Sequence, residues 1–354
     1  MKYLVLLFTL LLVLTVSCRP GTPPPPPTRE PVATPSLPRP TAPAPTEEPQ
    51  PAPTAVPTEA APTQTRQPNP SVPPPTRSAS TPSPTEGTPT GGGGEIDVSK
   101  LIEADTDILN IYKTVPGPYA DAMAAGARVV NLEPMDTFFV LWVPDGYESM
   151  AARRVMVIAH GHTGNAYREV GLELEFAQKY GYAIVAIQWW SGVGDKMYSG
   201  QQFYDFMNVA LQYMAYKYNA QLDKCAYRGW SMGSGISYEV TYLDRINGTN
   251  YLALTISHDG GMMPDPSKMA VGREFVTNLY NGVYGQDAFA GKHFYLYAGQ
   301  REQADYMRNT AEVITAFGGV VERLVEDVDA GHDGFYRHPQ YHEEAIEIFF
   351  RLTP

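Results

Sequence analysis

The pentapeptide GWSMG at residues 229–233 has the residue types and spacing of an activated serine. Residues 225–228 before it favour a strand, and residues 234–245 after it favour a helix. A chain that turns abruptly from strand to helix holds the intervening serine in a strained conformation, and a glycine on either side lets the two elements approach closely. Ser231 is therefore predicted to be a nucleophile at the edge of a sheet, at a helix N-terminus where developing negative charge is favoured.

A serine hydroxyl needs a nearby base to become a nucleophile. Among the seven histidines, His332 is the candidate base, because it lies between glycines in a loop after the last predicted strand. A histidine in such a loop has little to pack against, which favours a role in proton transfer. His338 and His342 are four residues apart, but Pro339 interrupts a regular helix between them, so both are expected on a solvated surface. No metal site and no cofactor are predicted.

The third member of such a site is a carboxylate that orients the imidazole and stabilises its positive form. It is expected between Ser231 and His332 in the sequence, directly after the seventh predicted strand. Glu302 fits this position best, because Asp305 already falls inside the helix that follows. Asp305, and Asp259 after the preceding strand, stay open as alternatives.

Attack of a serine on a carbonyl group creates an oxyanion, which two backbone N–H groups can stabilise. One donor is expected from Met232, directly after the nucleophile. The other is expected from the loop HGHTG at residues 160–164, with His162 as the donor and Thr163 as the alternative if the loop is offset by one. His160 is expected to be hydrogen-bonded within this loop.

Aromatic and thioether side chains near these residues predict a substrate pocket with apolar walls. Trp190 and Trp230 are the two side chains expected to contact the substrate. The other candidates for the mouth of the site are Trp189, Tyr198, Met262 and Met263. Cys225 is expected to be a buried thiol of the core.

Strands and helices that alternate along the chain must position these candidates, which is typical of a mostly parallel sheet with helices on both faces. The predicted strands are residues 128–131, 137–143, 154–159, 183–188, 225–230, 252–257, 293–298 and 320–328. The predicted helices are residues 167–180, 201–218, 233–247, 303–317 and 341–352. The first two strands are expected to pair as an antiparallel hairpin. The sequence thus predicts an α/β domain with an eight-stranded sheet over residues 95–354.

The composition changes sharply along the 354 residues, whose formal net charge is −12. Residues 19–90 hold 25 of the 33 prolines and no aromatic residue, so the segment 19–94, with its glycines at 91–94, is predicted to be a disordered stalk with a hinge. Residues 91–354 carry 20 basic and 33 acidic side chains, a net charge of −13. Such an acidic domain is not expected to bind nucleic acid or an anionic lipid surface.

The N-terminal residues 1–18 have the pattern of an export signal. A lysine precedes an apolar run of 14 residues, which is too short to span a membrane as a helix. The run ends at Cys18 after small residues and resembles the lipobox of bacterial lipoproteins, in which the cysteine is acylated. The segment predicts a lipoprotein held at the cell surface by Cys18, or a secreted protein if ordinary signal cleavage occurs near Ser17. Two cysteines do not make a disulfide framework.

Four segments together resemble the α/β-hydrolase superfamily. They are FFVLWVP at 138–144, VIAHG at 157–161, the pentapeptide at 229–233 and the Gly-His pair at 331–332. Within the superfamily they are most similar to secreted esterases of the feruloyl-esterase and polyhydroxyalkanoate-depolymerase type. The resemblance covers residues 137–354 and implies that Ser231 attacks an ester and that His332 transfers the proton. A glutamate as the acid, and the loop 259–264, depart from the family pattern.

The leading hypothesis from the sequence is an extracellular serine esterase that acts on a small or polymeric ester. One alternative is a serine peptidase on the same fold, although such enzymes often carry a second domain that gates the site. Another is a non-catalytic surface protein that binds a partner with the same fold. The combination of Ser231, Glu302 and His332 argues against this alternative, because a binding protein has no need of all three.

Overall fold

The computed structural model describes residues 96–354. The predicted signal segment with Cys18 and the predicted stalk at 19–94 lie outside the described residues. Within the described part, no helix has both the length and the apolar character that crossing a membrane requires.

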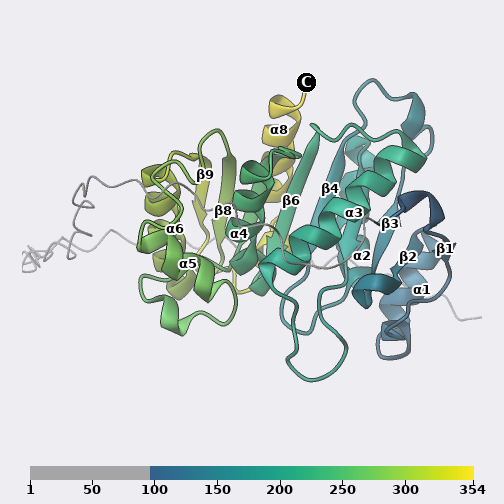
Figure 1. Ribbon diagram of the computed structural model, residues 1–354, viewed down its shortest axis with the longest axis horizontal. Coiled ribbons are helices and arrows are strands. Elements are labelled where there is room, and N and C mark those ends of the chain that lie inside the picture. Colours follow the sequence, from purple (N-terminus) through teal and green to yellow (C-terminus); the bar gives the residue numbers. More distant parts are fainter. Residues whose placement is uncertain (1–95) are drawn as a thin grey trace, which may run out of the picture. The chain divides into compact units, whose positions relative to one another are not determined.

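A nine-stranded, mostly parallel sheet forms the centre of the domain (Figure 1). Its strands are β1 (Glu103–Ala104), β2 (Arg128–Leu132), β3 (Thr137–Trp142), β4 (Val155–Ala159), β5 (Ala183–Ile187), β6 (Cys225–Trp230), β7 (Leu252–His258), β8 (His293–Ala298) and β9 (Val320–Glu326). Their order across the sheet is β1-β2-β3-β5-β4-β6-β7-β8-β9. The pairs β1–β2, β2–β3 and β3–β5 are antiparallel. All other neighbouring strands, from β5 across the sheet to β9, pair in parallel.

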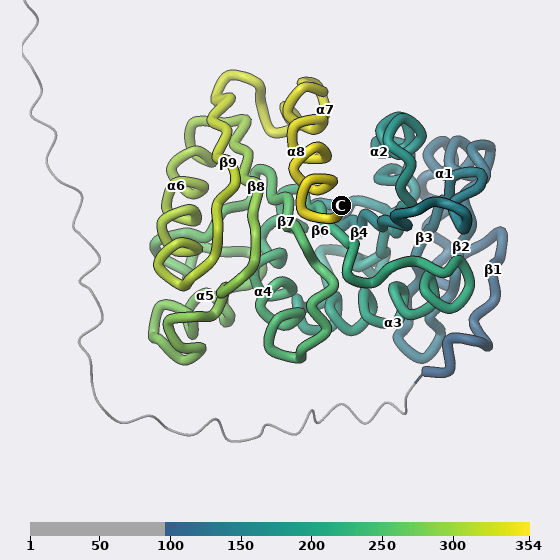
Figure 2. The backbone as a smooth tube through the Cα atoms, turned by 90° about the horizontal axis from the view of Figure 1, so that it is seen from above, coloured from purple at the N-terminus to yellow at the C-terminus, as the bar shows by residue number. Residues whose placement is uncertain are grey.

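Helices cover both faces of the sheet. They are α1 (Pro116–Ala124), α2 (Ala166–Tyr180), α3 (Gly200–Tyr218), α4 (Met232–Ile246), α5 (Arg273–Tyr280), α6 (Arg301–Ala316), α7 (Gly334–Arg337) and α8 (Pro339–Leu352). Figure 2 shows α1, α2 and α8 on one side of the sheet and α3, α4 and α5 on the other. Because the central strands are packed on both faces, β3, β4 and β5 are buried along their whole length and are almost entirely apolar.

All eight predicted strands are present, and most of their bounds agree within two residues. The antiparallel hairpin of β2 and β3 is also confirmed. The ninth strand, β1, has only two residues, which is too short to produce an alternating pattern. The five predicted helices are present as well. The helices α1, α5 and α7 are not predicted, since all three are short and α1 begins with the breakers Pro116 and Gly117.

The parallel part of the sheet gathers the candidate site. Since β4, β6, β7, β8 and β9 are adjacent and parallel, their carboxyl ends meet at one edge of the sheet. The loops that leave this edge are the usual place for a ligand in an open α/β sheet. They begin with His160, Ser231, Asp259, Gly299 and Asp327.

Candidate active site

Ser231 occupies the turn between β6 and α4 in a strained conformation, with φ 55° and ψ −115°. A positive φ is unfavourable for a residue with a side chain, and such strain is concentrated at functional sites. The Ser231 N–H donates to the His258 carbonyl on β7 over 2.9 Å, and the Ser231 carbonyl accepts from Gly235 in α4. The backbone thus fixes the serine between the strand and the helix, as the pentapeptide predicts.

The glycines of the pentapeptide are required by close backbone contacts. A Cβ atom on Gly233 would lie 2.2 Å from the Ala159 carbonyl oxygen, and one on Gly229 would lie 2.4 Å from the Gly233 carbonyl oxygen. These neighbours are backbone atoms, which cannot move aside cheaply. The helix α4 therefore starts directly against β4 and β6, and its first N–H groups point toward the edge of the sheet.

His332 lies in the loop after β9 and packs beside Trp230. The Trp230 indole N–H donates to the His332 carbonyl over 2.9 Å, and the two ring centroids are 5.5 Å apart. Partial burial lowers the pKa of His332, and the nearby Asp333 opposes this shift. The lowered pKa favours the neutral form of the imidazole, which is the form that can accept a proton.

The structure does not bring the predicted acid to the imidazole. Glu302 lies in the first turn of α6 with an exposed side chain, and its carboxylate accepts a hydrogen bond of 3.2 Å from the Tyr306 hydroxyl. Asp305 is exposed as well and pairs with Arg308. Both carboxylates lie on the outer surface of α6 because the helix begins at Arg301, directly after the turn that follows β8. No hydrogen bond in residues 96–354 joins either of them to His332.

Asp259 is the buried carboxylate at this edge of the sheet. It directly follows β7, is 1% exposed and has a φ of 57°. Its Oδ1 accepts from the Gly299 N–H over 2.7 Å, and the Gly299 carbonyl accepts from Gly331, next to His332, over 2.8 Å. Its Oδ2 has no hydrogen-bond partner within the described part of the chain. Asp259 is thus held against the histidine loop with one oxygen free.

Burial raises the pKa of Asp259 to about 7, although its hydrogen bond from Gly299 lowers the pKa, and the nearby Asp333 and Asp327 add to the rise. A buried carboxylate with a free oxygen can accept a hydrogen bond from an imidazole N–H, although no hydrogen bond joins Asp259 to His332 in residues 96–354. Among the three carboxylates considered from the sequence, Asp259 is the one that is buried and linked through Gly299 to the histidine loop.

The predicted oxyanion loop lies beside Ser231. A Cβ atom on Gly161 would be 3.3 Å from the Ser231 Cβ, so this backbone passes within contact distance of the serine. The loop turns through a hydrogen bond from Gly164 to the Gly161 carbonyl, and Thr163 has a φ of 48°. The His162 side chain is exposed, and its Nε2 lies 2.9 Å from the Asp195 Oδ1, so the side chain does not contact Ser231.

His160 is structural, as the sequence predicts. Its Nδ1 lies 2.8 Å from the Gly161 carbonyl oxygen, and its carbonyl accepts from the Trp189 indole over 2.9 Å. Complete burial lowers the pKa of His160 to about 4 despite the contact with Gly161, so the ring stays neutral. Trp189, a predicted mouth residue, is fully buried and belongs to the core.

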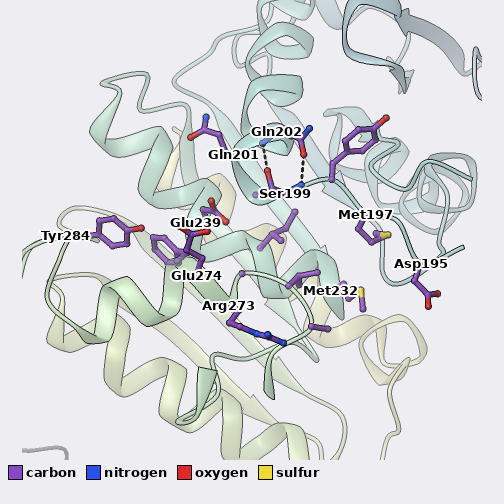
Figure 3. Close-up of a pocket in the computed structure, with 17 residues that line it drawn as sticks. Asp195, Met197, Ser199, Gln201, Gln202, Met232, Glu239, Arg273, Glu274 and Tyr284 are labelled. Carbon is purple, nitrogen blue, oxygen red and sulfur yellow. Dashed lines mark hydrogen bonds between the residues drawn. The ribbon is translucent and has the colours of Figure 1, made fainter. Parts of the chain in front are cut away.

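A cleft with a volume of about 610 Å³ begins at Met232, the predicted oxyanion donor (Figure 3). One side of the cleft is the face of α4 that carries Met232, Ile236 and Glu239. Burial raises the pKa of Glu239 to about 7, and the neighbouring Glu274 raises it too. The other lining residues come from the loop before α3 with its first turn, and from α5 with the segments on either side of it: Asp195, Met197, Tyr198, Ser199, Gly200, Gln201, Gln202, Ala270, Val271, Gly272, Arg273, Glu274, Phe275 and Tyr284.

The walls of this cleft are more polar than the predicted mouth. Of the predicted residues only Tyr198 lines it, while Met262 is fully buried in the core. The indole of Trp190 donates to the Gly194 carbonyl over 2.7 Å and so closes the loop before α3. Trp230 is half-buried between the nucleophile and the histidine loop.

A buried ionic cluster, formed by Arg228, Glu169, Glu173 and His342, lies beneath the site. The Arg228 guanidinium on β6 contacts Glu169 and Glu173 on α2, each at 3.0 Å. The His342 Nε2 on α8 lies 3.1 Å from Glu173, and all four side chains are at most 1% exposed. The Tyr336 hydroxyl on α7 donates to Glu169 over 3.0 Å. Through α2, the cluster therefore links α7 and α8, the helices that follow the His332 loop, to β6, the strand that precedes Ser231.

This cluster corrects the expectation for His342, which is buried and not on a solvated surface. Pro339 does not interrupt a helix between His338 and His342, because it is the first residue of α8, where its missing N–H has no helical partner to lose. Glu169 and Glu173 are four residues apart, a spacing that is also common on exposed helix faces. The sequence alone therefore gave no signal for the cluster.

The strand order from β2 to β9 and the sharp turn from strand to helix at Ser231 define the α/β-hydrolase fold. Cys225 on β6 is a free, buried thiol, as predicted. Within residues 96–354, no group of three or more histidine, cysteine, aspartate or glutamate side chains is arranged to hold a metal ion.

No protein-family model and no curated protein matches the sequence. Among solved structures, a fungal esterase from Rhizomucor miehei is 14% identical with a TM-score of 0.48, over 69% of this chain and 89% of the esterase. An arylesterase is 14% identical with a TM-score of 0.48, over 73% of this chain and 93% of the arylesterase.

An acylaminoacyl peptidase from Pyrococcus horikoshii is 14% identical with a TM-score of 0.45, over 61% of this chain and 39% of the peptidase. At such low identity these similarities say nothing about activity. The assignment of the fold rests on the strand order and on the turn at Ser231.

Proposed function

We propose that this domain is a serine esterase that hydrolyses a carboxylic ester through an acyl-enzyme. Ser231 is the nucleophile, His332 the general base, and Asp259, in place of Glu302, the acid that orients the imidazole. The observation that carries the proposal is the strained Ser231 backbone between β6 and α4, with the oxyanion loop in contact. Such strain has a cost in stability, and a serine that only packs does not require it.

In this mechanism the Ser231 Oγ attacks the ester carbonyl carbon while His332 accepts the hydroxyl proton. The oxyanion binds the N–H of Met232 and an N–H of the loop 160–164, from His162 or, if the register is offset, from Thr163. The C–O bond to the alcohol breaks, and His332 returns the proton to the departing oxygen. Water then repeats the sequence of steps on the acyl-enzyme and releases the carboxylic acid.

The lining of the cleft at Met232 bears on the kind of ester that would fit. Its hydroxyl, amide and carboxyl groups suit an alcohol or acyl group that carries polar substituents.

The test is hydrolysis of short p-nitrophenyl esters by the purified chain. Ser231→Ala is expected to lower kcat/KM by about 10³-fold or more, because the nucleophile is lost while the oxyanion donors stay. A fluorophosphonate probe should add its mass to the wild type and not to this variant. Ser267→Ala, at an exposed serine outside the cleft, is the matched control. Equal rates for Ser231→Ala and the wild type would reject the proposal.

The proposed setting of the enzyme is the outside of a cell, where Cys18 carries the lipid anchor. The support is the apolar run of residues 1–18 and the cysteine at its end. One acyl chain gives only marginal membrane binding, so at least two are expected. Mass spectrometry of the mature N-terminus should find them on Cys18, and an unmodified N-terminus at another residue would contradict the anchor.

A further inference from the structure

Arg168 lies at the mouth of the candidate site. It is the third residue of α2, the helix that follows the oxyanion loop. Its guanidinium carbon lies over the Trp230 ring, 5.0 Å from the ring centroid, and the side chain is partly exposed. Trp230 directly precedes Ser231 and donates a hydrogen bond to the His332 carbonyl. Arg168 is thus joined to both catalytic segments through one indole ring.

Arg168 differs from the other arginines of the described part of the chain. Every other arginine there has a carboxylate, hydroxyl or backbone carbonyl partner for its guanidinium: Arg128, Arg153, Arg154, Arg228, Arg245, Arg273, Arg301, Arg308, Arg323, Arg337 and Arg351. The Arg168 guanidinium has no such partner in residues 96–354, although residues 91–354 carry 33 carboxylates against 20 basic groups.

Stacking on the indole leaves the donors of Arg168 available. A guanidinium that stacks on an aromatic face keeps its N–H groups in the plane of the fork, directed away from the ring. That planar fork matches the two oxygens of a carboxylate. The stack also reduces the freedom of the side chain, so less conformational entropy is lost when a carboxylate binds.

We propose that Arg168 binds a carboxylate group of the substrate, so that the enzyme prefers esters that carry a second, ionised carboxyl group. The inference rests on the proposed esterase function and specifies its substrate class. The cleft at Met232 is lined neither by Trp230 nor by Arg168. The carboxylate therefore binds on the Trp230 side of Ser231, and the other part of the ester occupies the cleft.

The carboxylates that line the cleft are expected to increase this preference. The cleft itself carries three carboxylates, Asp195, Glu239 and Glu274, against one guanidinium, that of Arg273, which donates to the Met269 carbonyl. This excess of negative charge disfavours an anion in the cleft, whereas the Arg168 guanidinium has no hydrogen-bond partner in residues 96–354. The carboxylate is therefore expected to select the orientation of the ester as well as to increase its affinity.

The experiment compares matched pairs of esters on the full chain. Mono-p-nitrophenyl glutarate is paired with p-nitrophenyl valerate, and 3-carboxyphenyl butyrate is paired with phenyl butyrate. The first pair places the charge in the acyl group of the ester, and the second pair places it in the alcohol group. In at least one pair, the wild type should have a kcat/KM about tenfold higher for the charged ester, which corresponds to about 1.4 kcal/mol and is in the range of a charge-assisted hydrogen bond.

Arg168→Met keeps an apolar side chain on Trp230 and removes the charge. It should abolish the preference through a higher KM for the charged ester, and should change kcat/KM for the neutral ester by less than about twofold. Arg168→Lys should keep part of the preference, since the charge is kept without the fork. Because the site is partly exposed, 0.5 M salt should weaken the preference in the wild type.

Arg351→Met, at an exposed arginine on α8, is the matched control and should leave the preference unchanged. If Arg168→Met lowered kcat/KM equally for both members of each pair, Arg168 would only support the Trp230 indole and the inference would be wrong. A wild type without preference would reject it as well. A wild type that hydrolyses none of the four esters would reject the proposed esterase itself.

Discussion

At the scale of single residues, burial separates the candidate carboxylates of the site. Three carboxylates follow the neighbouring strands β7 and β8, and their positions in the sequence favour Glu302. The structure leaves Glu302 exposed and buries Asp259 with one free oxygen. The motif around Ser231 is local and can be recognised in the sequence, whereas the surroundings of each carboxylate depend on tertiary contacts that the sequence does not show.

Asp259→Asn is expected to change the pH dependence of hydrolysis. In the wild type Asp259 must be ionised, and its pKa of about 7 places the acidic limb of kcat/KM near pH 7. The variant should lose about 10³–10⁴-fold in kcat, because the imidazole is no longer oriented. Its residual activity should titrate below pH 6.5, since burial lowers the pKa of His332.

Glu302→Gln is the control for this pH profile, because it removes the exposed carboxylate and leaves Asp259 in place. We expect it to change kcat by less than about threefold, with an unchanged acidic limb, as for other exposed groups outside the chemistry. A larger loss in Glu302→Gln than in Asp259→Asn would restore Glu302 as the acid.

The buried Asp259 carboxylate should also lower the free energy of unfolding when it is ionised. The pKa of Asp259 is near 3.8 when unfolded and about 7 when folded, so the folded state binds the proton more tightly. The free energy of unfolding therefore falls as the pH rises from about 4 to 7, and the cost persists above pH 7.

Chemical denaturation of Asp259→Asn and the wild type at several pH values measures this cost. The variant is expected to be more stable at pH 8 by about 1–3 kcal/mol, and the difference should vanish toward pH 4. A variant that is less stable than the wild type at pH 8 would contradict this cost and would mean that a partner in the folded state stabilises the Asp259 charge.

At the scale of elements, the buried ionic cluster joins three segments that the pentapeptide alone does not connect. It links α2, β6 and α8, while Tyr336 extends it to α7, the helix that follows His332. Burial alone would raise the pKa of Glu173. The opposing effects of His342 and then Arg228 are larger and lower this pKa to about 2, so the carboxylate is ionised. The sequence predicts the strands well but does not predict this buried ionic cluster. Each residue of the cluster is an ordinary charged or titratable residue of its own helix or strand, and only tertiary contacts bring the four together.

Arg228→Met is expected to lower the free energy of unfolding by about 3–5 kcal/mol at pH 8, because it leaves Glu169 and Glu173 buried without their cation. Urea denaturation measures the loss. Arg245→Met removes a partly exposed arginine that pairs with Asp287 on the surface, and should cost less than about 1 kcal/mol. Similar losses for the two variants would mean that the cluster is hydrated and not a buried network.

At the scale of the whole molecule, the described residues contain every part that the proposed chemistry needs. The sheet from β1 to β9 and its three apolar clusters lie within residues 96–354, and so do Ser231, Asp259 and His332. The shift in composition near residue 94 favours residues 95–354 as an independent domain, because a segment without aromatic residues has little to contribute to a core.

A chain that starts at residue 95 should therefore fold and hydrolyse esters with a kcat within about twofold of the full chain. Its thermal midpoint should also agree with that of the full chain within about 2 °C, since a core of this size is sufficient for an independent domain. Differential scanning calorimetry and p-nitrophenyl ester kinetics on both chains measure these quantities. A large loss of activity together with an unchanged thermal midpoint would show that residues before 95 take part in the site, and a lower midpoint would show that they take part in the fold.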